Sequence, residues 1–254
     1  MKGKLSAIVL VLVAGLFAFQ CADAQEGLKL GFVALPQTTW MLNQQDIEAP
    51  LDQFEYKTTF GMAAGPSFGY NFSDKLGFRI NALYSAQGQS YKNLNADDEV
   101  VTHTRRLNYL KTPLLLGFNT NTEFNKLVFS FAVGYQASFL ISANYRNDDQ
   151  SYTPDEALFD DITDYPTNYQ RFSWLDHGPV VDLGLDIKLT YSVMANIHLR
   201  ADYGLGDAEN KNASYKFWQF GVPEDVTFYD AERGVTTNLT GGLVFGLTYT
   251  FSSY

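Results

Sequence analysis

Residues 240–254, which read TGGLVFGLTYTFSSY, constrain the fold more than any other stretch of the sequence. Large apolar side chains occupy every second position, with small or polar residues between them; the apolar set is Leu243, Phe245, Leu247, Tyr249 and Phe251. A strict period of two predicts a β-strand with one apolar face. In a soluble sheet that face would pack in a core, whereas in an outer-membrane barrel it would contact lipid.

Seven earlier stretches repeat this alternation. We expect strands at residues 28–35, 58–72, 76–88, 106–118, 127–144, 180–189, 194–205 and 240–254. The count is even, as bacterial single-chain barrels require. The links alternate between short ones of roughly five to nine residues and long ones of roughly fifteen to thirty, typical of barrels with short periplasmic turns and long extracellular loops.

Two local features test this pattern. Pro66 falls in the second predicted strand, and proline removes a ladder donor, so it usually marks an edge or a bulge. In the fifth predicted strand the alternation directs Gln136, Ser138 and Asn144 to the inner face.

Aromatic residues near the strand ends suit an interfacial belt; they are Trp40, Trp174, Trp218, Tyr84 and Tyr203.

The chemistry of the second face decides between a soluble and a membrane barrel. A soluble lipocalin-type barrel also has eight strands, but it turns its bulky apolar residues inward around a ligand. Here the second face carries Gly, Ser, Asn, Asp and Arg, which would make a wet, glycine-rich exterior. No apolar run after Phe19 is long enough for a spanning helix. The sequence therefore predicts an all-β, eight-stranded antiparallel transmembrane β-barrel.

The N-terminus has the pattern of a secretory signal peptide. Lys2 and Lys4 precede an apolar run at residues 5–19, and Ala22-Asp23-Ala24 supplies a small-x-small cleavage site. The apolar run of about 15 residues is shorter than the roughly 20 that a membrane anchor needs. We therefore expect a signal peptide at residues 1–24 and a barrel domain at residues 25–254.

Cleavage after Ala24 also removes the only cysteine, Cys21. Bulky and polar residues before Cys21 disfavour a lipoprotein, and the mature chain would contain no disulfide. Because Lys2, Lys4 and Asp23 together carry +1, removing them changes the formal charge from −10 to −11. An acidic protein without a basic patch is a poor nucleic-acid binder, so we expect no nucleic-acid partner.

Residues 107–118, LNYLKTPLLLGF, carry a resemblance to a known family. This stretch resembles the Tyr-Leu-x-x-Pro-Leu-Leu strand of the PorT-like outer-membrane β-barrel family of Bacteroidetes. The predicted signal ending at Ala24 and the final Gly-Leu-x-Tyr-x-Phe are similar to the same family. The resemblance implies an eight-stranded barrel in the outer membrane. It implies no single activity, although the namesake is an accessory of a protein-secretion machine.

Eight charged or ionisable side chains fall on the predicted inner face. They are Arg79, Lys111, Asp182, Asp186, Lys188, His198, Arg200 and Asp202. They could form an ion path or a proton relay, or they could fill the lumen with salt bridges. An eight-stranded barrel is only wide enough for its side chains to fill, and charges removed from water must be paired. We therefore expect a plug of salt bridges, with Asp182 opposite or one pair away from Arg200 or Asp202.

The predicted outer loop between the fifth and sixth strands is acidic. Its carboxylates are Asp148, Asp149, Asp155, Glu156, Asp160, Asp161 and Asp164. Clustered carboxylates can hold Ca²⁺, but the spacing matches no EF-hand loop. We expect a solvated surface loop, with weak divalent binding as the alternative, and we assign no metal or cofactor site.

A hydrolase would need an acid, a histidine and a nucleophile that converge at one rim. Asp176-His177 with Ser173 nearby invites this comparison, but the spacing marks no nucleophile. We expect a non-enzymatic integral outer-membrane barrel that contacts lipid and other envelope proteins of a secretion or uptake machinery. A small pore or ligand-conducting barrel is the alternative, and a membrane-embedded lipid or peptide hydrolase is the less favoured third.

Overall fold

The computed structural model describes residues 27–44, 47, 55–73, 75–94, 100–120, 126–147, 162–163, 170–219, 222–227 and 234–252. The predicted signal peptide and all seven carboxylates of the acidic outer loop lie outside the described residues. Among the residues that are described, no helix is both long and apolar enough to cross a membrane.

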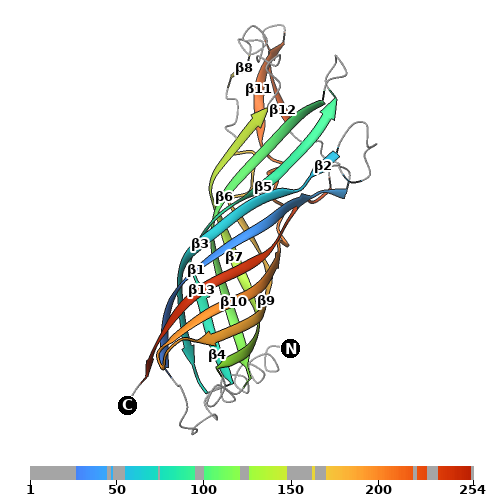
Figure 1. Ribbon diagram of the computed structural model, residues 1–254. Coiled ribbons are helices and arrows are strands. Elements are labelled where there is room, and N and C mark those ends of the chain that lie inside the picture. Colours follow the sequence, from blue (N-terminus) through green and yellow to red (C-terminus); the bar gives the residue numbers. More distant parts are fainter. Residues whose placement is uncertain are drawn as a thin grey trace, which may run out of the picture.

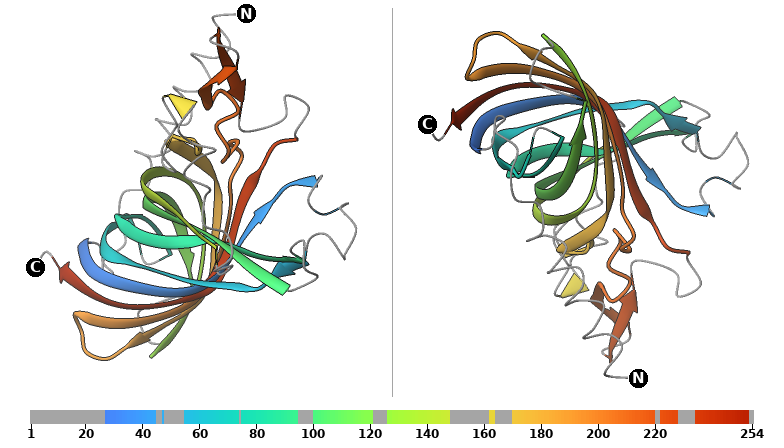
Figure 2. Two further views of the ribbon diagram at one scale, coloured as in Figure 1. Left: turned by 90° about the horizontal axis from the view of Figure 1, so that it is seen from above. Right: turned by 90° about the horizontal axis from the view of Figure 1, so that it is seen from below.

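Antiparallel strands close into a ring (Figures 1 and 2). The strands are β1 (Gly27–Leu42), β2 (Glu55–Lys57), β3 (Thr59–Asn71), β4 (Leu76–Asn81), β5 (Leu83–Leu94), β6 (Val100–Asn119), β7 (Leu127–Asn147), β8 (Ile162–Thr163), β9 (Leu175–Lys188), β10 (Val193–Tyr203), β11 (Ser214–Gln219), β12 (Val222–Thr227) and β13 (Thr237–Ser252). The wall runs β1, β3, β4 with β5, β6, β7, β9, β10 and β13, and β13 pairs back onto β1. The predicted eight-stranded barrel is confirmed, with β4 and β5 as one interrupted wall strand.

The interruption between β4 and β5 lies opposite Pro66. The Ala82 amide donates to the Pro66 carbonyl oxygen over 3.0 Å, and the pairing of β3 resumes on both sides of this point. Pro66 has no N–H to return the second bond of the pair, so the ladder breaks there. Since β3 pairs with β1 on its other side, Pro66 marks a local break in the wall and not an edge.

The alternation of faces is confirmed along the C-terminal strand. The predicted outward residues of β13 are between 43% and 55% exposed, whereas Val244 and Thr250 between them are buried. The same alternation continues on β3, where Phe60 is 79% exposed while Ala63 and Ser67, at odd-numbered positions, are buried. The barrel therefore presents a continuous apolar belt outward, as a lipid-facing wall requires.

One predicted orientation is wrong. Asn144 on β7 is exposed, and its neighbour Ala143 is buried. The register with β6 shifts between Asn108 and Tyr109, which pair with Ser142 and Leu140, so β7 contains one extra residue. Because side chains alternate with a period of two, a one-residue bulge exchanges the two faces beyond it.

Several strands are longer than predicted, and one predicted long loop is wrong. β6 begins at Val100 instead of residue 106, β9 begins at Leu175 instead of residue 180, and only residues 95–99 separate β5 from β6. The other end is as expected, with short turns such as the one closed by the Leu189 amide and the Val193 carbonyl over 2.9 Å. Strands above the membrane face water on their outer side and carry polar residues there. The alternation of apolar and polar residues therefore does not extend into these parts of the strands.

The extensions carry one side of the barrel past the membrane. β6 has 20 residues and β7 has 21, whereas β10 has 11. At about 3.3 Å per residue and a tilt of roughly 45°, a strand as long as β6 rises roughly 45 Å, against an apolar band of about 25 Å. β5 and β6 accordingly project at the end of the barrel opposite the C-terminus (Figure 1).

Candidate functional site in the barrel interior

All eight predicted interior groups lie on inward-facing positions of the wall. Arg79 and Lys188 are half-buried, and the remaining six are buried: Lys111, Asp182, Asp186, His198, Arg200 and Asp202. Their positions follow from alternation along β4, β6, β9 and β10, which places every second side chain in the lumen. Bonds between them, and to polar neighbours, form separate clusters along the barrel.

The first cluster is centred on Asp182. Arg200, its direct partner in the β9–β10 register, donates from Nε over 2.6 Å and from Nη2 over 2.8 Å. Arg79 donates to the same carboxylate from β4, which β6 and β7 separate from β9 in the wall. The predicted pairing of Asp182 with Arg200 is therefore confirmed, and it is a bidentate, charge-assisted contact.

Asp186 and His198 extend this cluster toward the end with the short turns. Asp186 Oδ1 accepts hydrogen bonds from Asn196 Nδ2 over 2.6 Å and from His198 Nε2 over 2.9 Å. A carboxylate can only accept, so Nε2 of His198 carries its proton. His198 Nδ1 lies 3.7 Å from Asp182 Oδ2, which places the imidazole between the two carboxylates. The predicted membership of His198 in the network is confirmed.

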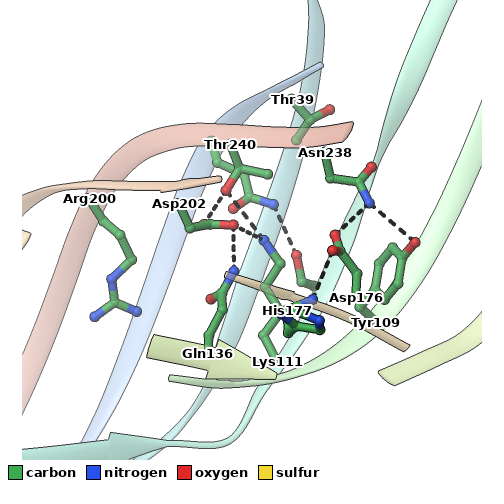
Figure 3. A network of polar contacts seen from close by, with 12 residues as sticks. Thr39, Tyr109, Lys111, Gln136, Asp176, His177, Arg200, Asp202, Asn238 and Thr240 are labelled. Carbon is green, nitrogen blue, oxygen red and sulfur yellow. Dashed lines mark hydrogen bonds and ion pairs between the residues drawn. The ribbon is translucent and has the colours of Figure 1, made fainter. Parts of the chain in front are cut away.

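The second cluster joins Lys111 on β6 to Asp202 on β10 (Figure 3). Lys111 Nζ donates to Asp202 Oδ1 over 2.8 Å, and Gln136 Nε2 donates to the same oxygen over 2.6 Å. Thr240 donates its hydroxyl to the other carboxylate oxygen and lies 3.3 Å from Lys111 Nζ. These groups come from four strands, so the cluster ties β6, β7, β10 and β13 together across the lumen.

A third cluster was missed from sequence. Buried Asp176 accepts hydrogen bonds from the His177 amide over 2.8 Å and from Asn238 Nδ2 over 2.9 Å (Figure 3). Asn238 Nδ2 also lies 3.5 Å from the hydroxyl of Tyr109 on β6, which is diametrically opposite β13 in the wall. The sequence pattern predicts this strand only from residue 180, which places Asp176 in the preceding loop, whereas β9 begins at Leu175.

The same extension of β9 separates the groups considered for hydrolysis. Asp176 faces the lumen, whereas His177 faces outward and forms a 2.6 Å hydrogen bond with the Tyr135 hydroxyl. Adjacent strand residues point to opposite faces, so Asp176 cannot orient the His177 ring. Ser173 lies before β9 and donates its amide to the Ala208 carbonyl. This trio therefore does not converge as a catalytic triad would.

Residues 204–213, which follow β10, pack into the outer end of the lumen. Glu209 is buried, and it accepts hydrogen bonds from Arg105 Nη1 over 3.0 Å and from the Thr236 hydroxyl over 2.8 Å. Beside it, one buried cluster joins inward residues of the wall to Phe172, which precedes β9, and to Ala208 of this segment. Its wall members are Met41, Leu107, Tyr109, Leu140 and Ala143. The segment therefore narrows the outer mouth of the lumen. The sequence alone did not reveal that Glu209 is buried there.

The interior thus alternates bonded charges with apolar contacts. Within the described residues, no group of three or more His, Cys, Asp or Glu side chains has a geometry suited to a metal ion. Most of the buried charged side chains bond to one another across the narrow barrel.

Comparison with known proteins agrees with this architecture. Residues 22–210 match a family model described as the outer membrane protein beta-barrel domain. The chain belongs to this family. As an outer membrane protein beta-barrel domain it resides in the outer membrane, in agreement with its apolar outer belt. No curated protein matches the sequence.

Solved structures of the same architecture are distant in sequence. The outer membrane protein OprG from Pseudomonas aeruginosa is 14% identical with a TM-score of 0.50, and the match covers 91% of this chain and 100% of that one. Neisserial surface protein A is 12% identical with a TM-score of 0.45, covering 89% of this chain and 97% of that one. The likeness to OprG shows the fold alone.

Proposed function

We propose that this protein is a non-enzymatic outer-membrane barrel that acts by contacting other envelope proteins of a secretion or uptake machinery. The observation that carries the proposal is the pairing of charges across the lumen, with Lys111 on β6 bonded to Asp202 on β10. A barrel whose interior is occupied in this way is a poor conduit. Its working surface is then on the outside, toward lipid and toward partners.

The strength of the interior bonding argues against the alternative of a pore. Asp202 accepts from both Lys111 and Gln136, so opening a path past it would leave a buried charge without its partner. Breaking a buried pair in this way costs about 3–5 kcal/mol. The packing of residues 204–213 at the outer mouth adds a second obstruction.

The one-sided extension of β5, β6 and β7 is the surface that best suits a protein partner. On its outer face the residues change from apolar Leu110 and Ile141 to polar Arg106 and Asn144, all of them exposed. A paired sheet that rises out of the membrane offers a partner a rigid surface, which reduces the entropy lost on binding. The apolar belt below it provides the contact with outer-membrane lipid.

The strand that resembles the PorT-like family supports the same proposal. Residues 107–118 lie in β6, with Leu107, Tyr109 and Leu115 buried in the lumen. We propose membership of the PorT-like subgroup on this resemblance, and its namesake is an accessory of a protein-secretion machine. An accessory role accounts for a barrel that spans the membrane with a filled interior.

Site-specific crosslinking in native outer membranes tests the proposal. A photoreactive amino acid is placed at Arg106 or at Asn144, above the apolar belt, and at lipid-facing Phe245 as the matched control. We expect both upper positions to capture the same protein, which also co-purifies stoichiometrically with the unmodified chain in mild detergent. If the chain purifies alone and the upper positions capture nothing beyond what Phe245 captures, the partner-binding role is wrong.

A further inference from the structure

A small cavity lies inside the barrel near the end with the short turns. Its water-accessible volume is about 60 Å³, and its lining includes Lys29, Asn71, Arg79, Asn119 and Asp186. A space of this size holds roughly four water molecules, or one small ion with part of its hydration. The cavity lies between the Asp182–Asp186 cluster and the short turns, so it forms a pocket at the inner mouth.

The lining of this cavity includes cationic donors that lack an acceptor. Among the described residues, half-buried Lys29 takes part in no ion pair, and Arg79 Nε is buried without a hydrogen bond although its Nη2 binds Asp182. Asp186, the one carboxylate in the lining, already accepts two hydrogen bonds at Oδ1. Lysine and arginine side chains have donors only, so the partner that these two cations lack is an acceptor.

Asn71 provides an independent sign of a ligand. Its side chain is only 4% exposed, and its Nδ2 is buried with no hydrogen-bond partner. The Oδ1 end of the amide lies on the side of Gly77 where a Cβ would project, so the Nδ2 end is the one left for the cavity that both residues line. A buried amide donor without an acceptor destabilises the fold, and a bound acceptor would remove this penalty.

The formal charge around the cavity points to the same ligand class. In the lining, Lys29 and Arg79 carry two positive charges and Asp186 carries one negative charge. A surplus of one positive charge inside a barrel wall requires a counterion or exposure to water. A small anion inside the cavity meets both the charge surplus and the free donors.

We propose that this cavity binds a small inorganic anion of halide size, held by Lys29, Arg79 and Asn71. The site is independent of the partner-binding role, because it faces the opposite end of the barrel and the lumen. The anion would satisfy the three free donors and stabilise the inner mouth of the barrel.

Bromide is the probe that tests this site. Crystals of the full-length mature protein grown in sodium bromide should show an anomalous peak between Lys29, Arg79 and Asn71. In detergent at constant ionic strength, replacing gluconate by bromide should raise the thermal unfolding midpoint of the wild type with saturation, by about a few degrees, as ligand linkage requires.

Two substitutions and one control complete the experiment. Lys29→Gln removes a cation, and Asn71→Asp replaces the free donor by a carboxylate of the same size; each should abolish the peak and the bromide-specific shift. Lys57→Gln removes an exposed positive charge on β2 and should retain both. The proposal is overturned if the wild type shows no peak, if bromide and gluconate give equal midpoints, or if the peak persists in Asn71→Asp.

Discussion

Lys111 of β6 and Asp202 of β10 meet inside the barrel with 2.8 Å between Nζ and Oδ1, although β7 and β9 separate their strands in the wall. Both side chains are almost completely buried, at 4% and 5% exposure. A contact of this kind fixes the distance between two sides of the ring. It makes the barrel cross-section depend on a specific pair of residues.

Breaking this pair should destabilise the barrel strongly. Asp202→Ala leaves the Lys111 ammonium buried without its carboxylate, which we expect to cost about 3–5 kcal/mol of unfolding free energy. Replacing both residues by apolar ones, as Lys111→Met with Asp202→Leu, should restore most of it. Urea unfolding in detergent measures the loss in Asp202→Ala and the recovery in the double variant. The control is Glu55→Gln, which breaks the exposed Lys92–Glu55 pair and should cost less than about 1 kcal/mol. If Asp202→Ala cost less than about 1 kcal/mol, the buried-pair assignment would be wrong.

An arginine at Leu247 tests the lipid-facing assignment of β13. Leu247 is 55% exposed on the outer face, so Leu247→Arg puts a charge into the apolar belt and should cost about 2–4 kcal/mol near mid-bilayer. Val100 is 67% exposed at the start of β6, above the belt, so Val100→Arg should have almost no effect. Folding into lipid vesicles, followed by heat-modifiable mobility on gels, compares the two. Normal assembly of Leu247→Arg would sink the lipid-facing assignment.

Gly184 should not tolerate a side chain. It pairs with His198, and a Cβ there would overlap the Ile197 carbonyl oxygen and the imidazole ring. Gly184→Ala must therefore displace His198 from Asp186, and overpacking of this kind costs about 1–3 kcal/mol. Gly117→Ala is the control, because the nearest atom to its Cβ would be 3.7 Å away. Thermal unfolding of the two variants should differ clearly; equal midpoints would mean that His198 is not held as described.

The bonds across the lumen also predict an electrically silent protein. In planar bilayers with molar KCl, the purified wild type should produce no stable conductance steps. A double variant, Lys111→Ala with Asp202→Ala, removes the central bond and should increase membrane leakiness relative to the wild type. Stable steps from the wild type would favour the pore over the accessory role.

The strands themselves could be predicted from sequence because alternation is a local property. Phe245 and Leu247 face outward for the same reason that Val244 faces inward, and no distant contact is needed to see it. The pairing of Asp182 with Arg200 could also be predicted, since the two lie on neighbouring strands joined by a short turn. The acidic outer loop falls outside the described residues, so its solvated or cation-binding character stays a prediction.

Other features depended on contacts between distant parts of the chain. The bulge that turns Asn144 outward arises from the register between β6 and β7. The first residues of β9, which include buried Asp176, are mixed in polarity, so the sequence pattern predicts a loop there. The Lys111–Asp202 bond and the Arg105–Glu209 contact join residues 91 and 104 positions apart. By itself the sequence determined the strands, their two faces and the membrane they span. Which inward groups meet was decided only by closure of the ring, because closure sets strands that are remote along the chain opposite one another across the lumen.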